Sequence, residues 1–191
     1  MKIDKILPIL LAIHATTALA GSATEAQLQT AQAATAAFGK ALKTELSKAI
    51  QSDGPVAAIA VCNMKAPKIA ESVSMDYDME ISRVSLKNRN PLNAPNDWEK
   101  QVLQSFESRL AAGENPADIS WNETVEMKGA KEFRYMKAIP TAGLCLQCHG
   151  TAIAEPVANK LSKLYPGDQA TGYSEGEIRG AFVVTETVLT P

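Results

Sequence analysis

Residues 121–127 read WNETVEM, residues 128–130 read KGA and residues 131–139 read KEFRYMKAI. Apolar and polar side chains alternate along both longer stretches, which is typical of half-buried β-strands. The short connection contains a glycine and favours a hairpin turn. In the second strand, the large side chains that share one face are Phe133, Tyr135 and Ile139. The sequence therefore predicts an antiparallel hairpin in this part of the chain.

Two further stretches predict strands that can extend this hairpin into a sheet. Ile81–Leu86 is short and partly β-branched, and Arg179–Val188 contains the run Phe182, Val183 and Val184. β-Branched and aromatic residues are enriched in strands. We therefore expect a small antiparallel sheet, built mainly from the second half of the chain.

The first half of the chain has the spacing of amphipathic helices. Phe38, Leu42, Leu46 and Ile50 recur every four residues and predict a helix over residues 23–51. The turn sequence that follows, SDGP, ends this helix.

A second helix is predicted over residues 56–72, where Pro67 either kinks the helix or opens a new one. Residues 87–95 contain three asparagines and two prolines and predict a loop. Asn96 or Asp97 then caps a further helix, which ends at Gly113. Its apolar stripe consists of Trp98, Val102, Phe106 and Leu110. Because helices precede most of the strands, we predict an α+β domain with helices against one face of the sheet.

The first twenty residues have the layout of a secretory signal peptide. Lys2 and Lys5 supply positive charge, an apolar stretch of about ten residues follows, and residues 18–20 read ALA. A membrane anchor is the alternative, but the apolar stretch is well short of the roughly 20 residues that a spanning helix needs, and Pro8 interrupts it. We predict cleavage after Ala20 and export to the periplasm.

Residues 21–191 predict a single domain with no further segment long enough to span a membrane. The chain has 19 basic and 21 acidic residues, and loss of the three charged residues of the signal leaves 17 and 20. A net charge near −3 does not suggest a nucleic-acid partner. His14 is also lost with the signal, so His149 is the single histidine of the exported chain.

Residues 145–149 read CLQCH, which is the spacing for covalent attachment of a c-type haem. The thiols of Cys145 and Cys148 can bond the two vinyl groups, and the adjacent imidazole of His149 can coordinate the iron. Attachment takes place outside the cytoplasm, in agreement with the signal peptide. The sequence therefore predicts one covalently attached haem c with His149 as the proximal ligand.

The alternatives for this motif are a redox-active dithiol, a plain disulfide and half of a zinc site. A thioredoxin-like dithiol usually opens a helix within a βαβ pattern, and no such pattern surrounds this motif. A zinc site needs two more ligands, for which only Cys62 and carboxylates remain. Haem attachment is the interpretation that these residues favour.

The ligand on the other side of the iron is left open by this reasoning. The candidates are Cys62, a lysine, a water molecule at an open position, and the methionines Met64, Met75, Met79, Met127 and Met136. An unpaired thiol is a liability in an oxidising compartment unless it is buried or ligated, so Cys62 is either a ligand or a small buried side chain. A thiolate would lower the reduction potential, whereas a methionine would raise it.

Haem propionates need cations or hydrogen-bond donors. Arg83, Lys87, Asn88 and Arg89 lie in or beside the loop over residues 87–95 and are candidates for these contacts. A solvated surface is the other interpretation of this cluster. The aromatic residues that are candidates either for packing on the macrocycle or for the core are Trp98, Phe133, Tyr135 and Phe182.

Several blocks of the sequence are similar to one known family. They are AIAVC at residues 58–62, APKIA at 66–70, RVSLKNRNPLNAP at 83–95, CLQCHG at 145–150, the glycines and tyrosine of 172–176, and GAF at 180–182. On these blocks, which span nearly the whole exported chain, it resembles a family of exported c-type haem proteins with a PAS-like fold. A soluble cyanobacterial protein with a cysteine- and histidine-ligated haem is typical of that family.

The resemblance implies a PAS-like antiparallel sheet with N-terminal helices packed against it. It also implies that Cys62, the cysteine of a Cys-x-x-x-Ala-Pro block, is the distal iron ligand. In the family, the domain also occurs as the extracytoplasmic sensing part of signalling proteins. No output domain is recognisable in these residues, so a sensor role implies a separate signalling partner.

Two functions therefore compete for this chain. The first is a periplasmic monohaem protein that acts in one-electron redox chemistry with a redox partner. The second is a haem-based sensory module, in which a gas or a redox change displaces or protonates Cys62. An enzyme such as a peroxidase needs a distal acid–base group, and no second histidine is left for that role, so we predict a protein that is not an enzyme.

Overall fold

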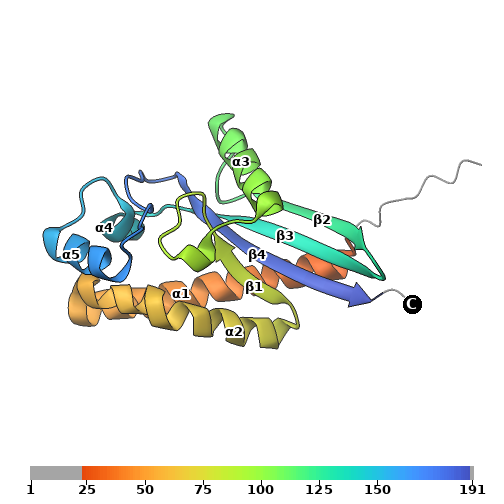
Figure 1. Cartoon of the computed structure of the whole chain (residues 1–191), viewed down its shortest axis with the longest axis horizontal. Coiled ribbons are helices and arrows are strands. Elements are labelled where there is room, and N and C mark those ends of the chain that lie inside the picture. Colours follow the sequence, from red (N-terminus) through yellow and green to blue (C-terminus); the bar gives the residue numbers. More distant parts are fainter. Residues whose placement is uncertain (1–22, 190–191) are drawn as a thin grey trace, which may run out of the picture.

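The structure of the protein is a computed structural model that describes residues 23–189. Four strands form one antiparallel sheet in the order β1-β4-β3-β2 (Figure 1). Their bounds are Glu80–Val84 for β1, Ser120–Met127 for β2, Ala130–Pro140 for β3 and Ile178–Leu189 for β4. The predicted α+β class and the predicted hairpin are confirmed, whereas the predicted signal peptide, residues 1–20, lies outside the described residues.

The N-terminal helix α1 (Glu25–Ala60) consists of two arms that meet at Gly54. Gly54 has a φ of +78° and a ψ of 175°, and a left-handed φ costs glycine little because it has no Cβ. Figure 1 shows the chain running along the sheet, turning back at this point and returning through α2 (Ala66–Tyr77). The break predicted at the SDGP sequence is confirmed, and it makes the N-terminal segment a helical hairpin.

A π-helical turn, Val61–Lys65, separates α1 from α2 and contains Cys62. Pro67 lies in the first turn of α2, where its missing N–H costs no helical hydrogen bond. Of the two roles considered for Pro67, it therefore opens a new helix. Single π-turns are rare in proteins, and those that occur are often found at functional sites. The backbone conformation around Cys62 is therefore unusual in itself.

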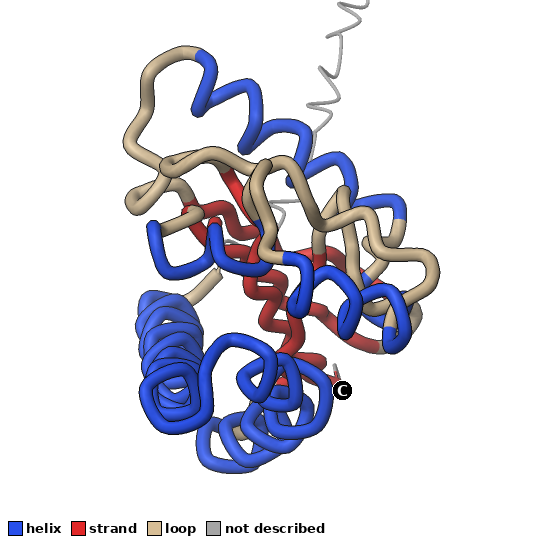
Figure 2. Tube along the Cα trace, turned by 90° about the vertical axis from the view of Figure 1, so that its left-hand side faces the viewer, coloured by secondary structure: helices blue, strands red, loops and turns tan. Residues whose placement is uncertain are grey.

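Helices cover both faces of the sheet, whereas the sequence predicted helices on one face. The α1–α2 hairpin packs on one face in a cluster that includes Phe38 and Phe133. The helix α3 (Asp97–Ala111) packs on the opposite face through Val102 and Phe106. Figure 2 shows the helices on opposite sides of the strands.

The central strand β3 explains the second helical layer. Phe133 and Tyr135 belong to the cluster under the α1–α2 hairpin, and Met136 and Ala138 belong to the cluster under α3. A strand with apolar side chains on both faces needs cover on both faces. The prediction used the larger side chains of one face alone and therefore missed the second layer.

Two helices that follow β3 lie beyond one end of the sheet, beside the closed end of the helical hairpin (Figure 1). The short helix α4 (Leu146–His149) contains the last four residues of the CLQCH motif, and Cys145 lies in the turn before it. The helix α5 (Glu155–Leu164) packs against the second arm of α1 in a cluster that includes Ile59 and Leu161. The sequence analysis did not predict α5. Within residues 23–189, no helix combines the length and hydropathy needed to cross a membrane.

Candidate functional site

A cavity lies where the helical hairpin, the end of the sheet, α4 and α5 meet. Its empty volume is about 1000 Å³, with its solvent-open mouth included. The apolar part of its wall includes Leu42, Leu46, Ile50, Ile139, Leu144 and Leu161. The C-terminal part of the apolar stripe predicted for the first helix therefore lines a cavity instead of packing in the core.

The residues that the sequence singled out for a haem and its iron are brought together on this cavity. Cys62, Cys145, Cys148 and His149 all line it. The three cysteines are half-buried and free. Cys62 arrives from the π-helical turn, whereas the other three come from the turn and helix that follow β3. The fold thus joins two distant segments of sequence at one site.

The imidazole of His149 is oriented by a backbone carbonyl group. Its Nδ1 lies 2.7 Å from the carbonyl oxygen of Ala170. Because a carbonyl oxygen can only accept a hydrogen bond, Nδ1 carries the proton and Nε2 keeps its lone pair. Tyr173 adds a backbone hydrogen bond, in which its N–H donates to the carbonyl oxygen of His149 at 2.9 Å. Metal-ligating histidines have this same arrangement, with the second ring nitrogen donating to a carbonyl or carboxylate group.

The surroundings of His149 keep its ring neutral. Burial, with smaller contributions from the positive charges of Arg179, Arg89 and Arg83, lowers the pKa of the imidazole to about 2. The hydrogen bond to Ala170 acts in the opposite direction and raises this pKa. A neutral imidazole is the form that ligates a metal.

Positive charge dominates the polar part of the cavity wall. Arg83, Arg89 and Arg179 line it, and no carboxylate of the described residues does. Arg89 is paired with Asp168 at 2.8 Å. Within residues 23–189, neither Arg83 nor Arg179 has a carboxylate partner. Partly buried charges without partners cost free energy, so this wall suits a ligand that brings anionic groups.

Arg83 and Arg89, two of the three predicted propionate contacts, reach the cavity in different states. Arg83 makes no ion pair in the described chain and lies above the ring of Phe38, 5.5 Å from its centroid. Arg89 is buried, and beyond its pair with Asp168 it donates through Nη2 to the carbonyl oxygen of Cys148 at 2.6 Å. Arg83 is therefore available to a ligand, whereas Arg89 stabilises the motif segment itself.

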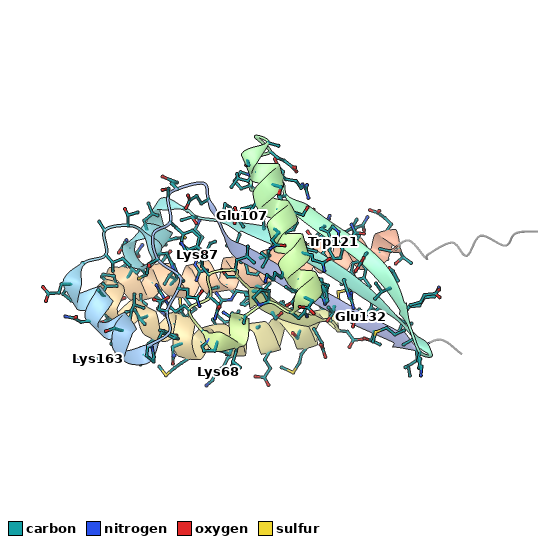
Figure 3. The ribbon with its side chains drawn as sticks, turned by 45° about the horizontal axis from the view of Figure 1, so that its top comes forward. Lys68, Lys87, Glu107, Trp121, Glu132 and Lys163 are labelled. Atoms are coloured by element: carbon teal, nitrogen blue, oxygen red, sulfur yellow. The ribbon has the colours of Figure 1, made fainter. Side chains whose placement is uncertain are left out.

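Lys87, the third predicted contact, is not brought to the cavity. Its Nζ donates to the carbonyl oxygen of Thr171 at 2.6 Å and lies 4.3 Å from the ring centroid of Tyr173. Figure 3 shows Lys87 between α3 and the α4–α5 end of the molecule. Lys87 does not line the cavity, because neighbouring residues in an irregular loop point in different directions.

Arg179 and Tyr165 are among the cavity residues that the sequence analysis did not assign to the site. Arg179 lies at the start of β4, with its Nε 3.2 Å from Nδ1 of His149. Tyr165 follows α5, and its hydroxyl accepts a hydrogen bond from the side-chain amide of Asn63 at 2.9 Å. Arg179 had been assigned to a strand, but nothing in the local pattern indicated which segment lies beside it.

Of the protein side chains considered as the sixth iron ligand, Cys62 alone lines the cavity in the described part of the chain. No lysine lines it. Met79 and Met136 are buried in the two clusters under the helical layers. The remaining methionines are exposed, namely Met64, Met75 and Met127. The arrangement favours Cys62 over any methionine.

The aromatic residues considered for packing on a macrocycle belong to the core instead. Phe133, Tyr135 and Phe182 pack under the α1–α2 hairpin. Trp98 of α3 stacks on Trp121 of β2, with ring centroids 5.8 Å apart. None of these residues lines the cavity, and the aromatic ring that does is Tyr165.

The sequence was also compared with known protein families. The model of the family described as Tll0287-like matches residues 16–186, which is nearly the whole chain. The chain belongs to the Tll0287-like family. The family resemblance drawn from the sequence blocks is thereby confirmed.

A solved structure supports the same fold for this member of the Tll0287-like family. The chain is similar to the crystal structure of the cyanobacterial heme-protein Tll0287, with 24% sequence identity and a TM-score of 0.65. The similarity covers 88% of this chain and 99% of the other. A search of the curated proteins found no match. At this identity the structural likeness establishes the α+β fold, and the ligand has to be argued from the site itself.

Proposed function

We propose that this member of the Tll0287-like family is an exported protein that binds one covalently attached haem c and acts in one-electron redox chemistry in the periplasm. The observation that carries the proposal is the meeting of Cys62, Cys145, Cys148 and His149 on one cavity. The matched cyanobacterial protein is described as a heme-protein, which supports the choice of ligand. The predicted signal peptide supports export, because haem attachment of this type takes place outside the cytoplasm.

The donor set of the cavity fits this group. Cys145 and Cys148 would hold it covalently, His149 would ligate the iron through Nε2, and Cys62 would ligate it from the other side. Arg83 would pair with a propionate, because it is a cation without an ion-pair partner in the described chain. When bound, the haem supplies an iron that exchanges one electron between its ferrous and ferric forms.

The side chains around the site have separate tasks in this function. Leucine and isoleucine side chains from α1, β3 and α5 make up the apolar part of the cavity wall and would shield a bound haem from water. The carbonyl group of Ala170 keeps the proton on Nδ1 of His149, so that Nε2 is free to ligate. A thiolate at Cys62 would add negative charge, which stabilises the oxidised state and lowers the reduction potential. The proposal therefore describes a low-potential redox protein with a separate redox partner.

The alternative is a haem-based sensory module that works with a signalling partner. The observation that favours it is the π-helical turn around Cys62, since such turns are irregular and frequent at functional sites. Addition of CO or NO to the reduced protein separates the two functions. Rapid and complete binding supports the sensor, and resistance supports the redox carrier. We propose no enzymatic activity, because His149 is already used as a ligand and residues 23–189 contain no second histidine that could act as an acid–base group.

The proposal is tested by producing the chain with its first twenty residues in a host that attaches c-type haem. We expect the protein in the periplasmic fraction, a pyridine haemochrome spectrum of c type and a mass increased by one haem. A Cys145→Ala, Cys148→Ala double variant should lose the covalent haem. A Cys62→Ala variant is the matched control, because it removes a cavity thiol outside the motif and should retain it. Absence of c-type haem from the wild-type protein would overturn the proposal.

A further inference from the structure

We infer that Arg179 is a positioning residue that acts on the iron through His149 and raises the reduction potential of the site. This inference rests on the proposed haem function. Neither the CLQCH motif nor the resemblance to the family assigns a role to Arg179.

The guanidinium group of Arg179 is fixed directly behind the proximal histidine. Its Nε lies 3.2 Å from Nδ1 of His149. Its Nη1 donates to the hydroxyl of Ser85 at 3.0 Å and to the carbonyl oxygen of Lys87 at 3.3 Å. On another side, the ring centroid of Tyr173 is 5.3 Å from the guanidinium carbon. These contacts hold the charge in one place.

The contact between Arg179 and His149 is a close approach of a cation and not an ordinary hydrogen bond. Nδ1 already carries the proton that it donates to Ala170 at 2.7 Å, so it has no lone pair to accept from Nε. Two opposite influences therefore meet at the ring. The carbonyl group of Ala170 draws the proton away and makes the imidazole a more basic ligand. The positive charge of Arg179 opposes any increase of positive charge on the ring or on the iron beyond it.

No carboxylate in the described chain neutralises Arg179. Arg89, which lies on the same cavity, is neutralised by Asp168 at 2.8 Å. Arg179 is half-buried, and a charge in such surroundings acts more strongly than one in water because the effective dielectric constant is lower. Arg179 is thus a cation that can influence the charge of the iron.

The expected direction follows from the charges. The ferric iron carries one more positive charge than the ferrous iron, so a nearby fixed cation favours the ferrous state. A thiolate at Cys62 favours the ferric state. The two sides of the site therefore act in opposite directions, and Arg179 limits how far the thiolate lowers the potential.

The test is a potentiometric titration of the haem-loaded protein and of three variants. Arg179→Gln should shift the reduction equilibrium towards the ferric form by about tenfold or more, since a unit charge in contact with the ring of His149 is removed. Arg179→Lys keeps the charge and should recover much of the wild-type potential. Arg109→Gln is the control, because it removes an arginine that does not line the cavity and pairs with Glu114 instead, so the potential should stay close to wild type.

The low-spin ferric EPR spectrum reports whether Arg179 acts through the histidine. Its g-values should change in Arg179→Gln and stay close to wild type in Arg109→Gln. An unchanged potential in Arg179→Gln would overturn the inference, as would equal shifts in both variants with unchanged g-values. If Arg179→Gln fails to fold, loss of the wild-type potential in Arg179→Lys would also count against a role for the charge. Wild-type protein without covalent haem would overturn the proposed function instead, so the two failures are distinguishable.

Discussion

The carbonyl oxygen of Ala170 accepts hydrogen bonds from two of the residues that define the cavity. Nδ1 of His149 donates to it at 2.7 Å and Nη2 of Arg89 at 3.2 Å. The N–H of Ala170 donates in turn to Oδ1 of Asp168 at 2.8 Å. The backbone of one residue thus sets the tautomer of His149 and connects it to an ion pair. The backbone, and not the alanine side chain, does this.

The replacement Cys62→Ala tests the distal ligand at the scale of one residue. It should remove the spectrum of a thiolate-ligated low-spin ferric haem and raise the reduction potential, because it deletes a negative ligand. The covalent haem should remain, since Cys145 and Cys148 are unchanged. Ultraviolet–visible and EPR spectra of the ferric protein make the measurement. The control is Met64→Ala, which changes an exposed side chain two residues away. An unchanged spectrum in Cys62→Ala would show that another group ligates the iron.

At the scale of elements, the π-helical turn is held at its middle and at its C-terminal end by side chains. The amide of Asn63 donates to the hydroxyl of Tyr165 at 2.9 Å, which links the turn to the end of α5. Lys65 forms an ion pair with Glu45 of the first arm of α1. Since Cys62 lies in this turn, its mobility depends on these links.

Loss of the link from Asn63 should make a ligand at Cys62 easier to displace. A neutral hydrogen bond contributes about 1 kcal/mol, which corresponds to about a fivefold change in an equilibrium. Asn63→Ala and Tyr165→Phe should therefore both increase the rate of CO binding to the reduced protein by up to about fivefold. Stopped-flow mixing measures the rate, and Met64→Ala in the same turn should leave it unchanged. Equal rates in all variants would show that the link does not restrain Cys62.

The elements that the sequence predicted well are those whose pattern is local. The hairpin of β2 and β3 and the break at Gly54 follow from period-two alternation and from turn residues, and both are observed. The helix α5 had a readable pattern that was not used, with Pro156 in its first turn and Val157 and Leu161 four residues apart. The position of α3 on the second face of the sheet was harder to predict from the sequence, because it depends on how the two sides of β3 are buried together.

The residues of the site also divide into those predictable from a local sequence pattern and those that only the fold brings together. The spacing of Cys145, Cys148 and His149 is a property of five consecutive residues, so it could be read directly. Arg179 lies beside Ser85 because β1 pairs with β4. The sequence of either strand alone does not determine the register in which two distant strands pair. Cys62 is an intermediate case. The small number of histidines and cysteines made it a candidate iron ligand, and the folded helical hairpin brings it to the cavity.

At the scale of the whole molecule, the buried pair of Arg89 and Asp168 links segments that the chain separates widely. Arg89 belongs to the loop between β1 and α3, and Asp168 to the segment between α5 and β4. The side chains are only 9% and 12% exposed, and Arg89 also donates to the carbonyl oxygen of Cys148 at 2.6 Å. Three parts of the structure therefore meet at one guanidinium group, directly behind the motif.

Removal of one partner should therefore destabilise the whole domain. Asp168→Asn leaves Arg89 with a buried charge and no carboxylate, which typically costs roughly 3–5 kcal/mol. For a domain of this size, that should lower the melting temperature by roughly 6–20 °C. Thermal unfolding followed by circular dichroism makes the measurement. The matched control is Glu114→Gln, which breaks the exposed pair with Arg109 and should change the melting temperature little, because solvent screens that pair. Equal small effects of the two variants would show that the buried pair adds no more to stability than the exposed one.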